Sequence, residues 1–341
     1  MRAAIHNPYL DTLGGGERYT VSFAKTLIDL GWQVDMEWKS ESISKVLENR
    51  FGIDLTGVNF VPDVKRGDGY DLTFWVSDGS IPVLRSRKNF LHFQIPFHHV
   101  GGNSLLNKMK LFKVDKIICN SEFTKKIIDR EYGVESIVIY PPIDTSQIRP
   151  KRKENIILNV ARFSGLLQNK GHEILVRAFK KIFDSGGRNW KLVIVGGSEV
   201  GVTDQINKLE ELSQDYPIEI KKNLDFRSLK ELYGISKIFW SASGFGEDEE
   251  KNPEKVEHFG MTAVESMAAG AIPLLFSAGG FKEIIEPDIN GYLWESTSSL
   301  ILKSKKIMDN PSLRVRLASS AKETSKKYSY EEFKSKITLL I

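Results

Sequence analysis

The hydrophobic positions of this chain form short apolar runs that alternate with longer stretches of helical period. An apolar run at residues 2–6 leads through a glycine-bearing loop into an amphipathic stretch at about 19–30, and a second apolar run follows at 32–38. Short apolar runs between turn residues indicate buried strands, whereas apolar residues at every third or fourth position indicate helices. This part of the chain therefore predicts a strand–helix–strand unit.

The alternation continues to about residue 140, stops, and then begins again. Further strands of the first half are expected at 58–61, 70–76, 90–95, 116–120 and 136–140. A proline-rich, charged run from Pro141 to Glu154 has the composition of an interdomain linker. Beyond it, strands are expected at 155–160, 190–195, 218–221, 237–241 and 272–276, with helices between them. The pattern predicts an α/β protein with two doubly wound parallel-sheet domains facing a cleft, at 1–150 and 151–325.

Composition sets further bounds on the class of protein. The chain has 341 residues, which suits about two domains, and its 41% hydrophobic and 27% charged residues are ordinary for a soluble protein. A net charge of +4 is too slight to predict a nucleic-acid partner. The single cysteine, Cys119, excludes an internal disulfide framework and fits a reducing compartment. Because no long apolar run occurs, we expect no signal peptide, no transmembrane helix and a cytoplasmic location.

One basic amphipathic segment, Ser104–Val114, leaves two interpretations open. Its lysines Lys108, Lys110 and Lys113 are interleaved with five large apolar residues, Leu105, Leu106, Met109, Leu111 and Phe112. A segment of this kind can lie on an anionic membrane surface. An ordinary surface helix with a solvated face has the same pattern. Peripheral contact with the inner face of a membrane is therefore one expectation for this segment.

A stretch in the second half carries two carboxylates at a suggestive spacing. Seven residues separate Glu257 from Glu265, which lies within a helix expected at Met261–Ala269 with Gly270 as its C-terminal cap. Free N–H groups at a helix N-terminus bind phosphates, and a carboxylate beside them suits a neutral hydroxyl. Hydroxyls and phosphates together suggest a sugar nucleotide. The structural alternative is that Thr262 caps the helix and Glu265 closes a capping box.

Two other loops carry groups that bind anions. The glycines of Gly14–Gly16 precede a helix and allow a backbone to approach an anion closely. This loop is no dinucleotide fingerprint, because Tyr19 stands where that motif needs glycine, and it is no P-loop. Arg162 and Lys170 flank a loop between a strand and a helix and could clamp a diphosphate. Taken singly, the glycines would be a tight turn and the two cations ordinary surface charges.

Histidines gather where the strand at 90–95 ends. His92 lies within this strand, and His98 and His99 follow it in a proline-interrupted loop. Ligands of open α/β sheets bind beyond the carboxyl ends of strands, although an ordinary surface or core role is open to each histidine. The chain has no His-Glu-x-x-His, no cysteine partner and no Asp-x-Asp. A metal site is therefore not expected.

Together these motifs resemble the retaining glycosyltransferases of family 4, which have the GT-B fold. The resemblance rests on Glu257-x7-Glu265 with its His-Phe-Gly insert and Ala-Ala-Gly ending, on Arg162 with Lys170-Gly171, and on Gly14-Gly15-Gly16-Glu17-Arg18. It runs over nearly the whole chain. The runs Asn7-Pro8-Tyr9, Tyr140-Pro141-Pro142-Ile143-Asp144 and Glu257-His258-Phe259-Gly260 are similar to lipid-linked-oligosaccharide mannosyltransferases and their bacterial relatives.

The resemblance implies a role for each motif residue. Arg162 and Lys170 would hold the donor diphosphate, Glu257 the transferred sugar and Glu265 the ribose hydroxyls. Backbone groups would face phosphate or sugar oxygens from both halves, at Gly14, Gly15, Gly16, Phe259, Gly260, Met261 and Thr262. His92 would contact the donor sugar or act near the acceptor, and Leu224 would lie by the nucleobase. A last helix at 326–341 would pack back on the N-terminal domain.

The implied activity is retaining transfer of a hexose from a GDP- or UDP-sugar to a glycan, glycolipid or similar acceptor. No metal or other cofactor is expected, because the cations take over the electrostatic role of a metal. Attack on the face from which the diphosphate departs and double displacement through Glu257 both stay open. Alternatives are a GT-B pseudoenzyme that serves as a partner subunit, a nucleotide-sugar epimerase and a sugar phosphorylase.

Overall fold

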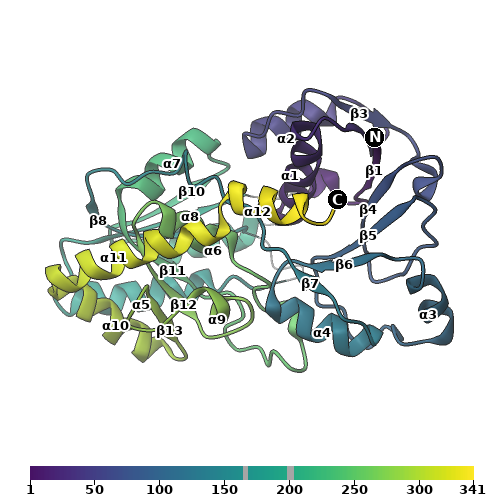
Figure 1. Ribbon diagram of the computed structural model, residues 1–341. Coiled ribbons are helices and arrows are strands. Elements are labelled where there is room, and N and C mark those ends of the chain that lie inside the picture. Colours follow the sequence, from purple (N-terminus) through teal and green to yellow (C-terminus); the bar gives the residue numbers. More distant parts are fainter. Residues whose placement is uncertain (164–167, 198–202) are drawn as a thin grey trace. The chain divides into compact units, whose positions relative to one another are not determined.

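The chain forms two compact α/β units. The structure, a computed structural model, describes residues 1–163, 168–197 and 203–341 (Figure 1). Unit 1 comprises Met1–Pro142 and Glu331–Ile341, and unit 2 comprises Ile143–Tyr330. Each unit contains one parallel sheet, whose buried strands are nearly continuous apolar runs, as expected for sheets covered on both faces.

The sheet of unit 1 has seven parallel strands in the order β3-β2-β1-β4-β5-β6-β7. They are β1 (Arg2–His6), β2 (Gln33–Glu37), β3 (Val58–Val61), β4 (Leu72–Val76), β5 (Lys88–Phe93), β6 (Lys116–Cys119) and β7 (Ile137–Val138). The helices are α1 (Gly15–Asp29), α2 (Ile43–Phe51), α3 (Leu105–Leu111), α4 (Glu122–Tyr132) and α12 (Tyr330–Thr338), with short 3₁₀ turns at Leu10–Thr12 and Lys65–Gly67. α12 packs on α1, where the Phe333 ring meets the Tyr19 ring edge-on at 5.1 Å.

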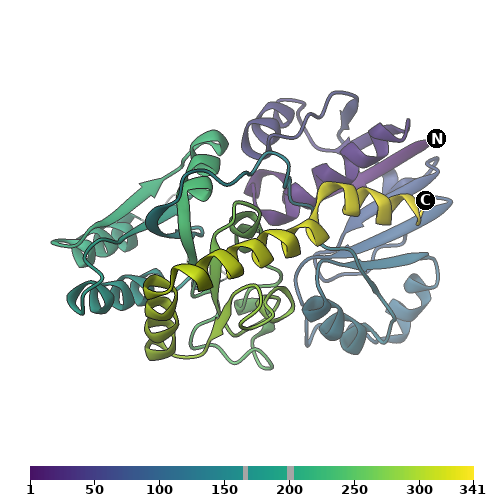
Figure 2. The ribbon, with the colours of Figure 1, turned by 60° about the vertical axis from the view of Figure 1, so that its left-hand side comes forward.

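The sheet of unit 2 has six parallel strands in the order β10-β9-β8-β11-β12-β13. They are β8 (Glu154–Val160), β9 (Lys191–Gly196), β10 (Ile218–Lys222), β11 (Ser236–Ser241), β12 (Ile272–Phe276) and β13 (Tyr292–Trp294). The helices are α5 (His172–Asp184), α6 (Thr203–Ser213), α7 (Phe226–Ile235), α8 (Met261–Ala268), α9 (Phe281–Ile284), α10 (Thr297–Asp309) and α11 (Pro311–Ser325), with 3₁₀ turns at Pro253–Lys255 and Lys326–Tyr328. Helices flank this sheet on both sides (Figure 2).

The two strand orders place a switch point in each sheet. The chain enters each sheet at a central strand, builds toward one edge, and then returns to the other side of that strand. The switch therefore lies between β1 and β4 in unit 1 and between β8 and β11 in unit 2. Loops leave neighbouring strands in opposite directions at such a point, which opens a crevice at the carboxyl ends. These topologies confirm the predicted α/β class with two doubly wound parallel sheets.

Several boundaries differ from the sequence-based expectation. α1 begins at Gly15 rather than near residue 19, because the carboxylate of Glu17 accepts a hydrogen bond from the Gly14 N–H at 2.7 Å and stabilises a first turn made of glycines. The short strand β13 was not expected, since three residues are too few to show a period. The last helix spans Tyr330–Thr338, within the segment predicted at 326–341, and a 3₁₀ turn at Lys326–Tyr328 occupies the start of that segment.

The capping-box interpretation of the helix at 261–269 is wrong. α8 begins at Met261, and its cap is Gly260, whose φ of 115° lies in the left-handed region that favours glycine. Within the described part of the chain, no side chain caps this terminus. Glu265 is instead buried in the body of the helix, where its Oε2 accepts a hydrogen bond from the Tyr233 hydroxyl at 2.7 Å. Gly270 follows the helix with a φ of 73°, as its predicted capping role requires.

Candidate functional site

The switch point of unit 2 brings together a lysine and a glutamate that are 87 positions apart in the sequence. Lys170 ends the loop that follows β8, and Glu257 lies in the loop that joins β11 to α8. The Lys170 Nζ is 2.9 Å from the Glu257 Oε2. The two side chains are only 11% and 22% exposed, so this ion pair is largely shielded from water.

Glycine at position 171 permits this approach. Gly171 caps α5 with a φ of 65°, and an added Cβ would lie 2.6 Å from the Ala242 Cβ at the end of β11. Any larger residue would therefore push the Lys170 loop away from the strand that leads to Glu257. The Lys170-Gly171 pair in the sequence thus combines a charge with the backbone shape that positions it.

The charge of Glu257 is maintained by its neighbours. Burial would raise the pKa of this carboxyl, but the ion pair with Lys170 outweighs burial and holds the pKa below its usual value, with smaller contributions from His258 and Ser243. The group is therefore a carboxylate near neutral pH. It can accept hydrogen bonds from hydroxyl groups, and Lys170 offers a cation beside it.

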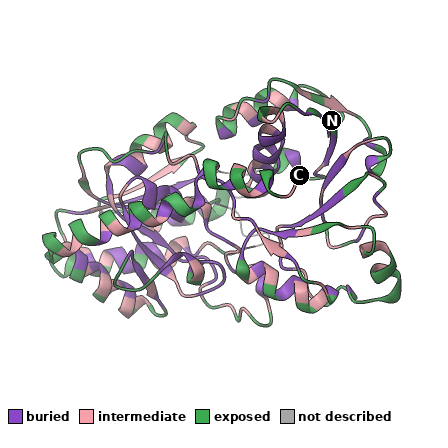
Figure 3. Ribbon diagram, viewed as in Figure 1, coloured by how far each residue is buried: buried purple, intermediate pink, exposed green. Residues whose placement is uncertain are grey.

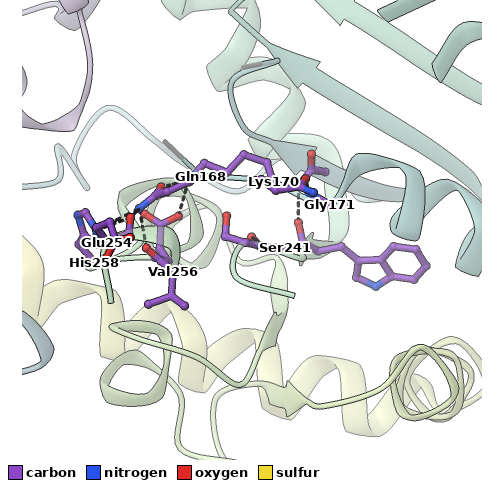
Figure 4. Close-up of polar contacts among 12 residues, drawn as sticks. Gln168, Lys170, Gly171, Ser241, Glu254, Val256 and His258 are labelled. Atoms are coloured by element: carbon purple, nitrogen blue, oxygen red, sulfur yellow. Dashed lines mark hydrogen bonds and ion pairs between the residues drawn. The ribbon is translucent and has the colours of Figure 1, made fainter. Parts of the chain in front are cut away.

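Gln168 is a site residue that the sequence analysis missed. Its Nε2 donates to the carbonyl oxygens of Val256 at 2.5 Å and Glu254 at 3.2 Å, and its Oε1 accepts from the Lys170 Nζ at 2.5 Å (Figure 4). One amide side chain thereby ties the Lys170 loop to the Glu257 loop. No local pattern marks such a residue, because its partners lie almost 90 positions away.

A second missed feature is the glycine pair Gly279 and Gly280, whose backbone packs directly against the backbone of the Glu257 loop. The Gly280 N–H donates to the Glu257 carbonyl oxygen at 2.8 Å. A Cβ on Gly279 would lie 2.1 Å from that same oxygen, and one on Gly280 would lie 2.4 Å from the His258 carbonyl oxygen. Adjacent glycines before a short helix were the available signal, because they often mark close approach of two backbones.

The N-terminus of α8 lies directly after the Glu257 loop. An added Cβ on Gly260 would lie 2.6 Å from the Phe281 ring, so the turn into the helix is closely packed as well as conformationally demanding. The N–H groups of the first turn, at Met261 and Thr262, have no intrahelical carbonyl to bind. Together with the positive end of the helix dipole, they form a site suited to an anion beside the Lys170 ammonium.

The other predicted residues of unit 2 lie near the carboxyl ends of its strands. Phe259 is buried, and its ring packs edge-on against Tyr328. Arg162 is exposed after β8, and the predicted loop between the two cations lies outside the described residues at 164–167. Leu224 is half-buried beyond the end of β10. All of these positions lie at or beyond carboxyl ends of strands or on helices that follow them.

The predicted residues of unit 1 gather around the start of α1. Gly14 caps the helix, Gly15 begins it, and the Gly16 carbonyl accepts a hydrogen bond from the Gln94 Nε2 at 2.9 Å. A Cβ on Gly16 would lie 2.1 Å from the Gln94 Oε1, so a larger residue at this position would displace the Gln94 amide from its hydrogen bond. Gln94 was not predicted.

His92 lies beneath this helix rather than at the surface. Its side chain is 0% exposed, its ring stacks on Tyr19 at 4.1 Å, and its Nδ1 donates to the Ile118 carbonyl oxygen at 3.0 Å. Burial lowers the pKa of His92 to about 3, which keeps the imidazole neutral. A direct contact with a sugar stays a prediction, and it would require Tyr19 or its helix to move.

The described residues offer neither a cluster of metal ligands nor a membrane-spanning helix. Residues 1–163, 168–197 and 203–341 hold no group of three or more histidine, cysteine, aspartate or glutamate side chains placed to bind a metal ion. Within the same ranges, no helix has the length and apolar character needed to cross a bilayer.

Comparison with known proteins shows the family. Residues 143–324, more than half of the chain, match the family described as glycosyl transferases group 1, and the chain belongs to this family. An uncharacterized glycosyltransferase of Methanocaldococcus jannaschii is 27% identical over 97% of this chain and 95% of its own length. The human GDP-Man:Man(3)GlcNAc(2)-PP-Dol alpha-1,2-mannosyltransferase is 28% identical over 64% of this chain, a match that spans 46% of the human protein.

Solved structures share the fold. A glycosyltransferase from Rickettsia africae superposes with a TM-score of 0.77 at 20% identity, over 99% of this chain and 97% of that one. The Anabaena protein HepE, crystallised with UDP and glucose, superposes with a TM-score of 0.75 at 16% identity, over 100% of this chain and 99% of that one. The two parallel-sheet units are therefore those of a GT-B glycosyltransferase, which confirms the fold class implied by the motifs.

Proposed function

We propose that this glycosyltransferase moves a hexose from a nucleotide-diphosphate sugar to a glycan or lipid-linked acceptor, with retention of anomeric configuration and without a metal ion. The observation that carries the proposal is the shielded ion pair of Lys170 and Glu257 beside the uncapped N-terminus of α8. A cation and free N–H groups suit a diphosphate, while a carboxylate next to them suits a sugar hydroxyl. The same few residues thus match both parts of the donor.

The division of labour follows from charge. As the bond between the sugar and the diphosphate breaks, negative charge grows on the leaving phosphate, and Lys170, Arg162 and the α8 N-terminus stabilise it. Glu257 accepts hydrogen bonds from hydroxyls of the transferred sugar. Glu265 takes the ribose hydroxyls, with Tyr233 orienting one of its oxygens at 2.7 Å. Leu224 lies by the nucleobase.

The chemical step is attack on the face from which the diphosphate leaves. The bond from the sugar C1 to the phosphate oxygen breaks, a bond from C1 to the acceptor oxygen forms, and the acceptor proton moves to the departing phosphate. The ion pair supports this route over double displacement, because a carboxylate held by Lys170 is a weaker nucleophile than a free one.

The relatives suggest the chemical class of the donor and of the acceptor, but not the individual compounds. The mannosyltransferase relatives carry GDP-Man and a dolichol-linked oligosaccharide in their names, whereas HepE was crystallised with UDP-glucose. We therefore propose a GDP- or UDP-hexose as donor and a lipid-linked or glycan acceptor.

A thermal-shift screen of GDP-, UDP-, ADP- and dTDP-sugars tests the donor assignment, because a ligand that binds only the folded state raises apparent stability. We expect one nucleotide class to raise the melting temperature of the wild type and to lose this effect in Lys170→Met. The matched control is Lys181→Met, an exposed lysine of α5 away from the site. A screen in which no nucleotide sugar stabilises the wild type contradicts the proposal.

The stereochemical step is tested with the identified donor. NMR of the product reports the configuration at C1, and Glu257→Gln separates the two routes. The amide still accepts hydrogen bonds from hydroxyls, so same-face attack predicts a reduced but measurable rate. Double displacement needs the carboxylate and predicts complete loss. An inverted product, or phosphorolysis (transfer of the sugar to inorganic phosphate) without transfer to an acceptor, would exclude the proposed reaction.

A further inference from the structure

The helix α3 of unit 1 exposes its apolar side chains to solvent, which is the reverse of an ordinary surface helix. Leu105, Leu106, Met109 and Phe112 are 77%, 62%, 67% and 92% exposed, and none of the residues in α3 is buried. Figure 3 shows the helix as exposed along almost its whole length. Soluble proteins scatter exposed apolar residues singly, so four within eight positions call for an explanation.

These four residues form one side of the helix. Leu105, Met109 and Phe112 follow the spacing i, i+4, i+7, which places them in a stripe along one face, and Leu106 widens the stripe. The inward contacts of this segment are made by Leu111 and Val114, which pack against the core formed by Leu91, Phe93 and their neighbours. The helix is therefore held to unit 1 by its opposite side, and the apolar stripe is left without a partner among the described residues.

Lysines flank the apolar stripe. At 100° per residue, Lys108 lies on one side of the stripe and Lys110 on the other, while Lys113, beyond the end of α3, falls in line with Leu106. The chain has no acidic residue between Val100 and Val114. A narrow apolar stripe bordered by long cationic side chains matches a bilayer interface, where apolar groups enter the acyl region and the ammonium groups meet anionic headgroups.

A hollow next to the helix supports the same partner. Lys110 lines a pocket of about 360 Å³ together with Arg66, Asp78 and the stacked rings of His6 and Trp75. Two cations and one carboxylate make this pocket suitable for the polar part of a lipid rather than for an acyl chain. A second copy of the chain fits less well, because a symmetric contact through this face would bring lysines against lysines. Four side chains also fall far short of the roughly 800 Å² per partner that stable interfaces bury.

We propose that α3 docks this protein on an anionic lipid surface, with the stripe of Leu105, Leu106, Met109 and Phe112 inserted and with Lys108, Lys110 and Lys113 at the headgroups. Binding by this helix is reversible, since a short apolar stripe anchors a protein only when electrostatic attraction adds to it. The inference is independent of the proposed glycosyl transfer, because it concerns lipid that need not be a substrate.

Vesicle co-flotation of the full chain tests the proposal. We expect binding to vesicles of phosphatidylcholine mixed with phosphatidylglycerol at low salt, weaker binding at high salt, and little binding to phosphatidylcholine alone. The variant Leu105→Ser/Phe112→Ser should lose at least about tenfold in partition, because each serine removes most of one buried apolar side chain. The variant Lys108→Gln/Lys110→Gln/Lys113→Gln should lose about fivefold for each lysine.

Matched controls remove the same chemistry elsewhere. Leu302→Ser/Val315→Ser replaces two residues of unit 2 that are 70% and 72% exposed. Lys45→Gln/Lys181→Gln/Lys322→Gln removes three exposed lysines outside α3. Both controls should bind vesicles as the wild type does. Circular dichroism melting verifies folding, and the lysine variant keeps the test decisive if the serine variant unfolds, because it removes no apolar contact.

Three results would overturn the proposal. The first is equal partition of the wild type to neutral and anionic vesicles. The second is unchanged partition of both α3 variants. The third is a dimer in sedimentation equilibrium that dissociates in Leu105→Ser/Phe112→Ser, which would assign the stripe to a second copy of the chain. The vesicles contain no nucleotide sugar, so none of these results depends on the donor assignment.

Discussion

Two helices predicted to bind phosphate through their N-termini, α1 in unit 1 and α8 in unit 2, differ in which groups contact those N-termini. At α1, the carboxylate of Glu17 accepts hydrogen bonds from the Gly14 N–H and from the Thr12 hydroxyl. At α8, no side chain of the residues that the structure describes caps the terminus, and the carboxylate of the preceding loop, Glu257, is paired with Lys170 instead.

This difference shows that a glycine loop before a helix does not by itself make an anion site. A helix whose own third residue neutralises its N-terminus has less attraction left for a phosphate, whereas an uncapped terminus beside a cation retains it. The sequence presents both loops as equivalent candidates. In the structure, the N-terminus of α8 is the more favourable anion site of the two. The substitutions below test this ranking of the two helices, from the largest expected effect to the smallest.

The largest effect is expected from Lys170→Met, which removes the cation beside the α8 terminus. It leaves the Glu257 carboxylate without its partner and the leaving phosphate without one of its stabilising charges. The rate of sugar transfer should fall by roughly 10²–10³. The measurement is kcat/KM with the donor found by thermal shift, and Lys181→Met serves as the control. Turnover like that of the wild type would place the catalytic charge elsewhere.

A smaller effect is expected from Gly280→Ala, which disturbs the backbone that leads into α8. The added Cβ would lie 2.4 Å from the His258 carbonyl oxygen and 2.6 Å from the Phe259 Cα, so the loop must shift. We expect a loss of about 1–3 kcal/mol in the free energy of unfolding and weaker stabilisation by the donor. Gly246→Ala, at a glycine with open space around it but a left-handed φ of 86°, is the control for backbone strain without a steric clash. Unchanged donor stabilisation would show that the loop tolerates displacement.

The buried imidazole of His92, which stacks on Tyr19 of α1, predicts that the stability of the fold depends on pH. Burial lowers the pKa of His92 from 6.5 to about 3, so below pH 6.5 the unfolded chain binds a proton that the folded chain does not. Stability is therefore lost as pH falls from 6.5 toward 3, by up to about 1.4 kcal/mol per pH unit. His92→Phe should show a shallower loss in urea unfolding between neutral and mildly acidic pH. His172, whose pKa burial lowers to about 4, is present in both proteins and cancels in the difference. Parallel curves would contradict the assignment of this loss to His92.

The smallest effect is expected from Glu17→Ala, which opens the α1 terminus. Loss of the cap should cost about 1 kcal/mol, or a fall in melting temperature of about 2–4 °C. Donor-dependent stabilisation should change far less than in Lys170→Met. If Glu17→Ala abolishes it instead, the terminus of α1 matters to the donor as much as that of α8, and the ranking of the two helices fails.

The local features of this protein could be predicted from its sequence. The spacing of apolar residues located most of the strands, and the order of the elements indicated two parallel sheets. The motifs resembled a glycosyltransferase family, and the comparison confirms that the chain is a group 1 glycosyltransferase. These features are local because side-chain alternation and turn residues act over a few positions. The spacing of Glu257 and Glu265 likewise placed one carboxylate before a helix and one within it, and the structure shows both there.

Tertiary structure alone decided what each of these residues contacts. Strand order decides which distant segments meet. It brings Lys170 to Glu257, lets Gln168 connect their two loops, and buries His92. The same holds for α3, for which the sequence is compatible both with an ordinary surface helix and with a helix that contacts a membrane. The amphipathic pattern of this segment is the same whether its apolar stripe faces the core or the outside. Only the packing of Leu111 against the core shows that the stripe points outward. A periodic pattern determines which residues share a face, but the rest of the fold determines which way that face turns.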